Sequence, residues 1–175
     1  MKKLFFSLLF LAAYEAGSAQ SIKKVLIQNT GNSTGCSVYS FCDLAFKNDY
    51  SDDSSMVFTA ECSKDSITCG VICVKLREAI TNLNDAEELM TKYLDYLKTS
   101  FSIKKSVGYG KGNQLRNNAN TRGIVDYWED DEKNNWKVKA WTDKKYIAVL
   151  YAYSARSLPE TRIDVFLNSM NFPAN

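Results

Sequence analysis

Hydrophobic and polar positions alternate most regularly over residues 121–153, and this pattern predicts three antiparallel strands joined by two polar turns. In the middle strand, Trp136, Val138 and Ala140 occupy every second position, so we expect them to face the core. The intervening lysines and Trp141 should then face outward, or face whatever covers the far side of the sheet. The last of the three strands is apolar on both faces, which predicts a central strand that is covered twice.

Two segments, 85–99 and 160–170, repeat their apolar residues at the spacing of an amphipathic helix. Asn84 and Glu87 resemble a capping box at the start of the first segment, and the second starts with a capping box around Pro159. The expected buried stripes are Ala86, Leu89, Met90, Tyr93, Leu94 and Leu97 in the first helix, and Ile163, Phe166, Leu167 and Met170 in the second. Each helix would bury its stripe on the sheet.

Further strands are expected at 38–46, 56–62 and 67–76, with a weaker edge strand near 22–27. A glycine-punctuated strand is expected at 103–112. Its glycines would cradle a phosphate only if a helix followed directly, and a polar stretch follows instead, so we expect a bent strand. The predicted fold class is α+β, an antiparallel sheet with two main helices packed on it.

The chain starts with two lysines, an apolar run at 4–13 and small residues at 17–19, which together are typical of a signal peptide. We predict that residues 1–19 are removed and that residues 20–175 fold as a single α+β domain. No later segment is long and apolar enough to span a bilayer. The expected location is therefore the periplasm or the secreted space.

The balance of charge disfavours some classes of partner. The chain carries 22 basic and 20 acidic side chains, a formal net charge of +2. Such a nearly neutral chain is not expected to bind nucleic acid, and it should make peripheral membrane contact or none.

All five cysteines fall within a short part of the chain: Cys36, Cys42, Cys62, Cys69 and Cys73. In an oxidising compartment, two disulfides and one free thiol are the simplest arrangement. Cys62 and Cys69 flank a predicted hairpin turn, so a cross-strand bridge between them is geometrically reasonable. Cys73 would then pair with Cys42 or Cys36. A metal site is not expected, because the chain has no Cys-x-x-Cys pair and no histidine.

The lack of histidine also removes Ser-His-Asp and Cys-His catalysis and the HExxH zinc proteases. Acidic residues concentrate at 129–132, at a predicted hairpin tip. A solvated turn is expected there rather than a calcium site or a carboxylate pair for hydrolysis. We therefore predict a protein that is not an enzyme, with no catalytic residues and no cofactor.

Aromatic residues concentrate on the same predicted sheet. Core packing accounts for most of them, but rings that face outward would form a binding surface. The candidate binding surface consists of Tyr109, Tyr127, Trp128 and Trp141.

The order of elements resembles the Mog1/PsbP-like α/β/α sandwich family: strands, a long helix, a glycine-marked strand, a tryptophan-rich meander and a closing helix. The resemblance covers residues 38–172 and includes the Phe-Leu-x-Ser-x-x-Phe ending at 166–172. It implies an accessory or binding protein, since members of that group mostly lack a shared active site. The chain departs from the family in its extra cysteines and at Phe46-Lys47, where Phe-Pro often follows the first strand.

The expected function is a non-enzymatic accessory or binding protein that engages another envelope or extracellular protein through an aromatic sheet face. The alternative hypothesis is a small-ligand or glycan-binding module with a pocket between sheet and helix. A carboxylate-dependent hydrolase is the third and least favoured hypothesis.

Overall fold

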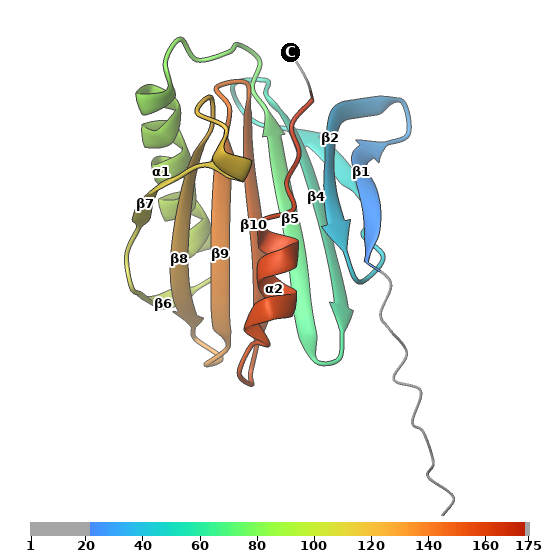
Figure 1. Ribbon diagram of the computed structural model, residues 1–175, viewed down its shortest axis with the longest axis vertical. Coiled ribbons are helices and arrows are strands. Elements are labelled where there is room, and N and C mark those ends of the chain that lie inside the picture. The colour runs from blue at the N-terminus through green and yellow to red at the C-terminus, as the bar shows by residue number, and fades with distance from the viewer. Residues whose placement is uncertain (1–21, 174–175) are drawn as a thin grey trace, which may run out of the picture.

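The computed structural model describes residues 22–173, and the predicted signal peptide lies outside them. The elements are β1 (Lys23–Asn29), β2 (Asn32–Ser40), β3 (Lys47–Tyr50), β4 (Met56–Lys64), β5 (Ile67–Lys75), α1 (Leu83–Ser100), β6 (Ile103–Ser106), β7 (Gly110–Asn113), a 3-10 turn (Leu115–Asn117), β8 (Arg122–Asp130), β9 (Asn135–Thr142), β10 (Tyr146–Ser154) and α2 (Glu160–Leu167). β1 and β2 form a separate hairpin, and the other strands form one antiparallel sheet in the order β3-β4-β5-β10-β9-β8-β6, with β7 also paired to β8 (Figure 1). The fold class is α+β, as predicted. Neither described helix has the length and apolar character needed to cross a membrane.

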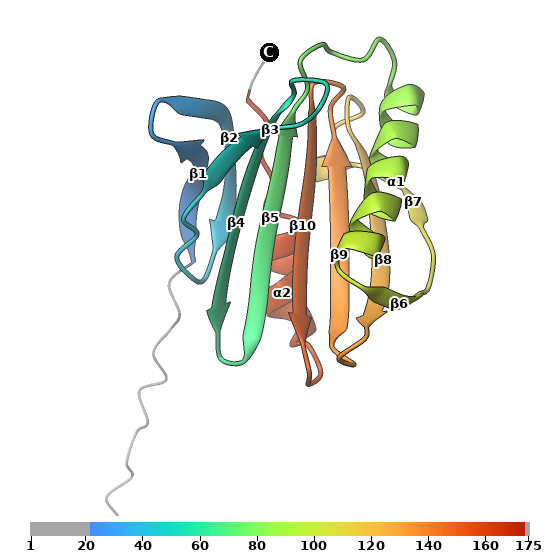
Figure 2. The same ribbon diagram turned by 180° about the vertical axis from the view of Figure 1, so that it is seen from behind.

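The two faces of the large sheet are covered differently. α1 packs on one face over β8 and β9, whereas α2 and the β1–β2 hairpin lie on the other face (Figures 1 and 2). Two separate hydrophobic cores result, one on each face. Every residue of the central strand β10 except Tyr153 is buried, which confirms the prediction of a strand covered twice.

The meander forms as predicted. In its middle strand, β9, the side chains of Trp136, Val138 and Ala140 face α1. Trp141 points to the opposite side, where its Nε1 donates to the carbonyl oxygen of Leu167 at 2.9 Å. Lys137 and Lys139 reach the same helix and pair with Asp164 at 3.1 and 3.3 Å. The far side of the meander is therefore covered by α2.

Both helices form, but their ends and stripes differ in detail from the prediction. The cap of α1 is Asn82, whose side chain accepts from the backbone of Asn84 and Asp85. Leu89 is 39% exposed, so its place in the buried stripe is wrong. α2 starts after Pro159 with no side-chain cap bond, so the predicted capping box is also wrong.

The prediction of one continuous strand at 38–46 is wrong. β2 ends at Ser40, whose hydroxyl accepts from the backbone N–H of Cys42 at 3.2 Å and bonds the Cys42 carbonyl oxygen at 2.7 Å. This local bonding turns the chain away from the hairpin, and a separate edge strand, β3, then joins the large sheet. The predicted strand at 103–112 is two short strands, since the backbone bends at Gly108, where φ is +107°.

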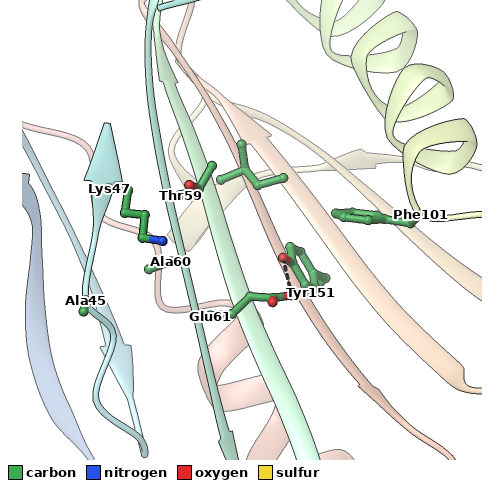
Figure 3. A pocket seen from close by; sticks show the side chains of 8 residues that line it. Ala45, Lys47, Thr59, Ala60, Glu61, Phe101 and Tyr151 are labelled. Carbon is green, nitrogen blue, oxygen red and sulfur yellow. Dashed lines mark hydrogen bonds between the residues drawn. The ribbon is translucent and has the colours of Figure 1, made fainter. Parts of the chain in front are cut away.

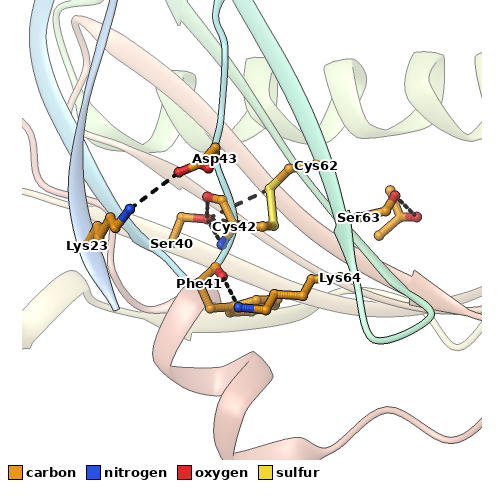
Figure 4. Close-up of a disulfide and its surroundings, with 9 residues drawn as sticks. Lys23, Ser40, Phe41, Cys42, Asp43, Cys62, Ser63 and Lys64 are labelled. Carbon is orange, nitrogen blue, oxygen red and sulfur yellow. Dashed lines mark hydrogen bonds and ion pairs between the residues drawn. A yellow bond between two sulfur atoms is a disulfide. The ribbon is translucent and has the colours of Figure 1, made fainter. Parts of the chain in front are cut away.

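Within residues 22–173 there is one disulfide, Cys42–Cys62, with a Cα–Cα distance of 5.9 Å (Figure 4). Cys62 and Cys69 are direct partners on β4 and β5. The predicted bridge between them is nevertheless wrong, because the sulfur of Cys62 is bonded to Cys42. Cys36, Cys69 and Cys73 are buried thiols. The disulfide ties the segment that follows β2 to the large sheet.

Candidate functional site

α1 leaves half of its sheet face open. Figure 2 shows that no helix lies over β4 and β5 on this side. A groove of about 560 Å³ lies there, between β3 and the C-terminal end of α1 (Figure 3). The residues that shape it are Lys47, Thr59, Glu61, Ile72, Phe101 and Tyr151. The groove lies on the open sheet surface beside the end of α1.

The strand register places most of the groove residues in two rows across β3, β4, β5 and β10. The rows are Lys47–Thr59–Ile72 and Glu61–Gly70–Tyr151. Directly paired residues share a face of the sheet, so both rows point to the α1 side. The groove is therefore assembled from strands that lie far apart in the sequence.

Tyr151 lies across β5 because position 70 is a glycine. A Cβ at Gly70 would stand 2.1 Å from Cζ of the Tyr151 ring, so no larger residue fits beneath the ring. The phenol hydroxyl donates to Oε1 of Glu61 at 2.7 Å. Burial and this hydrogen bond raise the pKa of Tyr151, so the hydroxyl stays protonated and keeps donating. The Glu61 carboxylate is thereby held in a fixed orientation on the groove wall.

An aromatic cluster closes the helix side of the groove. The ring of Phe101 lies 5.3 Å from that of Tyr151 and 5.1 Å from that of Trp136. Trp136 stacks on Tyr153 at 4.1 Å. On α1, burial raises the pKa of Tyr93 to about 12. Trp136 and Tyr151 are buried, and Trp128 of the predicted surface lies 6.3 Å from Trp136, so this cluster is part of the core beneath α1.

Polar side chains stand beside this aromatic cluster. Lys47, Thr59 and Glu61 are exposed. Within the described part of the chain, neither the Lys47 ammonium nor the Thr59 hydroxyl has an ion-pair or side-chain hydrogen-bond partner. An apolar floor with a few convergent polar groups is typical of small-ligand sites.

The predicted binding surface is not a single surface. Trp128 and Trp141 are 3% and 4% exposed and belong to the cores on opposite faces of the sheet. Trp128 Nε1 donates to the buried carboxylate of Asp126 at 2.6 Å. The proposal that these tryptophans face a partner is therefore wrong. Tyr109 is partly buried against α1, and Tyr127, at 46%, is the exposed member.

The acidic cluster at 129–132 has structural roles. Asp130 is buried and accepts from Nε1 of Trp136 at 2.8 Å, so the expectation of a solvated turn is wrong at this residue. Glu129 pairs with Lys105 at 2.9 Å. Across residues 22–173, no three His, Cys, Asp or Glu side chains converge to hold a metal ion.

Comparison with known proteins does not place the chain in a family. No protein-family model, no curated protein and no solved structure matches it. The functional inference therefore depends on the geometry of the groove.

Proposed function

We propose that this protein is a non-enzymatic binding protein whose groove between α1 and β3 holds a carbohydrate. The supporting observation is the hydrogen bond from Tyr151 to Glu61 across Gly70, which orients an exposed carboxylate on the groove wall. The Tyr151 ring is itself buried and serves to orient Glu61, whereas Phe101 at the helix side of the groove is partly exposed. A sugar ring would pack its apolar face on Phe101, and its hydroxyl groups would donate to the carboxylate at the edge.

Lys47 and Thr59 suit the same ligand. Sugar hydroxyls donate and accept, so they can bond the Lys47 ammonium, the Thr59 hydroxyl and the Glu61 carboxylate together. Because Lys47 and Glu61 carry opposite charges on one wall, the groove favours a neutral, hydroxyl-rich ligand over a strongly charged one.

A glycan array, followed by titration calorimetry on the sugars retained, tests this proposal. Glu61→Gln should weaken binding about tenfold or more, because a hydrogen bond to a charged acceptor is lost. Glu88→Gln is the matched control, since this exposed acid lies on α1 and pairs with Lys92. A protein that retains no glycan, or that loses affinity equally with both variants, would contradict the proposal.

A second candidate function is engagement of another envelope or extracellular protein through the opposite side of the molecule. There, Leu26, Tyr39 and Val165 are 49%, 41% and 45% exposed. The backbone N–H of Tyr39 donates to Ser169 at 2.9 Å, so the hairpin and the end of α2 are joined at this surface. Lys24 is exposed and lies opposite Tyr39. The partner expected is therefore a protein with an apolar patch flanked by acidic residues.

Capture from envelope extract on the immobilised chain tests the second candidate. A single partner should be retained near one-to-one, be released by salt, and be lost with Leu26→Ser and Val165→Ser. Val107→Ser is the control, because Val107 is 81% exposed and lies between β6 and β7. A partner that all three variants retain equally would exclude this surface.

We also propose a Mog1/PsbP-like architecture, a single domain over residues 20–175, and a periplasmic or secreted location. The two helices on opposite faces of one antiparallel sheet support the Mog1/PsbP-like architecture. The Cys42–Cys62 disulfide fits an oxidising compartment and so supports the location. Fractionation of cells that express the full chain should recover it outside the cytoplasm, starting at Gln20. Recovery in the cytoplasm with Met1 intact would contradict the location.

A further inference from the structure

Two of the three thiols meet where the β1–β2 hairpin covers the large sheet. Cys36 on β2 and Cys73 on β5 are both completely buried and belong to the same core. Both side chains lie in the core between the hairpin and the sheet. We infer that Cys36 and Cys73 form a second disulfide site, in addition to Cys42–Cys62.

The strand geometry brings these two cysteines together. The hydroxyl of Tyr146 donates to the carbonyl oxygen of Thr34 at 2.9 Å, which anchors β2 on β10. Cys36 lies two residues beyond Thr34 on the buried face of β2. Cys73 lies opposite Ala148, which is two residues beyond Tyr146. β2 and β10 run in the same direction (Figure 1). Cys36 and the residue paired with Cys73 therefore both lie two residues further along their strands than the Tyr146–Thr34 hydrogen bond.

The third thiol is a poorer partner for either cysteine. Cys69 lies four residues before Cys73 on β5, a separation too large for a bridge along one strand. Its cross-strand neighbour, Cys62, is already bonded to Cys42. Cys69 is therefore expected to be the single free thiol of the oxidised protein.

The bond would form by exchange with an external disulfide such as oxidised glutathione. The thiolate of one cysteine attacks the external disulfide and releases one glutathione thiol, and the second cysteine then displaces the other. Two thiol protons and two electrons leave the protein, and one external disulfide becomes two thiols. Both thiols are completely buried in the folded protein and out of reach of an external disulfide, so this exchange has to occur before the hairpin docks on the sheet.

A second bridge has a clear structural role. The hairpin is not part of the large sheet. Cys42–Cys62 holds the chain just after β2 ends, and Cys36–Cys73 would hold the middle of β2 against β5. Loss of such a bridge typically lowers Tm by about 5–10 °C in a domain of this size.

Disulfide mapping of the full-length chain, folded in a glutathione redox buffer, tests the inference. The protein is unfolded, alkylated without reduction and digested with trypsin, which cleaves it into 25–47, 48–64 and 65–75, the peptides that contain the cysteines. Cys42–Cys62 joins the first two peptides and serves as the internal control. The expected product is a three-peptide species with one label, on Cys69. Release of 65–75 with two labels, or a three-peptide species labelled on Cys73, would overturn the inference.

Single substitutions give a second readout. Cys36→Ala should release peptide 65–75 with two labels and lower Tm by about 5–10 °C. Cys69→Ala should keep the three-peptide species and remove its label. Should Cys36→Ala fail to fold, the map of the unsubstituted chain still decides between the two outcomes.

Discussion

The indole of Trp141 lies over the backbone of Gly123. The two residues are direct partners on β9 and β8, and a Cβ at position 123 would stand 2.2 Å from Cζ3 of the ring. This placement lets the indole reach α2, where it donates to Leu167. Gly70 and Tyr151 repeat the arrangement on the opposite face of the sheet. On each face of the sheet, a glycine paired with an aromatic residue thus leaves room for that residue's ring to lie across the neighbouring strand.

Replacement of Gly123 by alanine should destabilise the fold. The new methyl group would displace the Trp141 ring and break its hydrogen bond to α2. We expect a loss of about 2–4 kcal/mol in the free energy of unfolding, measured by urea denaturation.

A double-mutant cycle separates ring displacement from a general effect of alanine. In a Trp141→Leu background, the added cost of Gly123→Ala should fall below about 1 kcal/mol, because the clash is gone. Costs that add fully would mean that the two residues are not coupled.

Much of the architecture follows from local periodicity. The meander and α1 were predictable because their apolar positions repeat at periods of two and of about 3.6 residues. The segment 38–46 was not, because both of its halves carry apolar residues. The pattern could not show that Ser40 bends the chain, that residues 41–46 leave the hairpin without forming a strand, and that the next strand begins only at Lys47.

The candidate site was less predictable, for a spatial reason. Trp128 and Trp141 were predicted to share one binding surface, because the alternation within each strand did not show that α1 and α2 cover the two faces on which they lie. The groove exists because α1 lies over β8 and β9 and leaves β4 and β5 open. Gly70, isolated within an apolar strand, was the one local signal of close approach by another group.

Acid should destabilise the protein partly through Asp126. Burial alone would raise the pKa of this carboxyl, but hydrogen bonds from Ser106, Trp128 and backbone N–H groups hold it below the usual 3.8. Because the pKa of Asp126 is lower in the folded than in the unfolded state, its ionised carboxylate stabilises the fold at pH values above the unfolded-state pKa. This contribution is lost as pH falls through the folded-state value.

Urea midpoints measured from pH 7 to pH 3 check this contribution. Asp126→Asn should be less stable at pH 7 and should lose less stability than the unsubstituted protein on acidification. The control Asp52→Asn, at an exposed turn, should keep the original pH dependence. An unchanged pH dependence in Asp126→Asn would rule out the proposed linkage.

Removal of the Cys42–Cys62 bridge should be costly. The two cysteines are 20 residues apart, and a loop of that length corresponds to about 3 kcal/mol of unfolded-state entropy. The variant with both cysteines replaced by alanine should show this loss in urea denaturation. Ser63→Ala, at the exposed neighbour of Cys62, is the control and should change stability by less than about 0.5 kcal/mol. A loss below about 1 kcal/mol in the double variant would mean that the bridge constrains little.

Two substitutions in the groove separate the orientation of Glu61 from the packing of the ring above Gly70. Tyr151→Phe keeps the ring but removes the hydroxyl that donates to Glu61, so glycan affinity should fall several-fold while stability falls by about 1 kcal/mol. Gly70→Ala should push the ring away from β5 and lower both glycan affinity and stability, the latter by about 2–4 kcal/mol. Calorimetry and urea denaturation on the same preparations measure the two quantities. If Tyr151→Phe binds glycan as tightly as the unsubstituted protein, the oriented carboxylate is not what recognises the ligand.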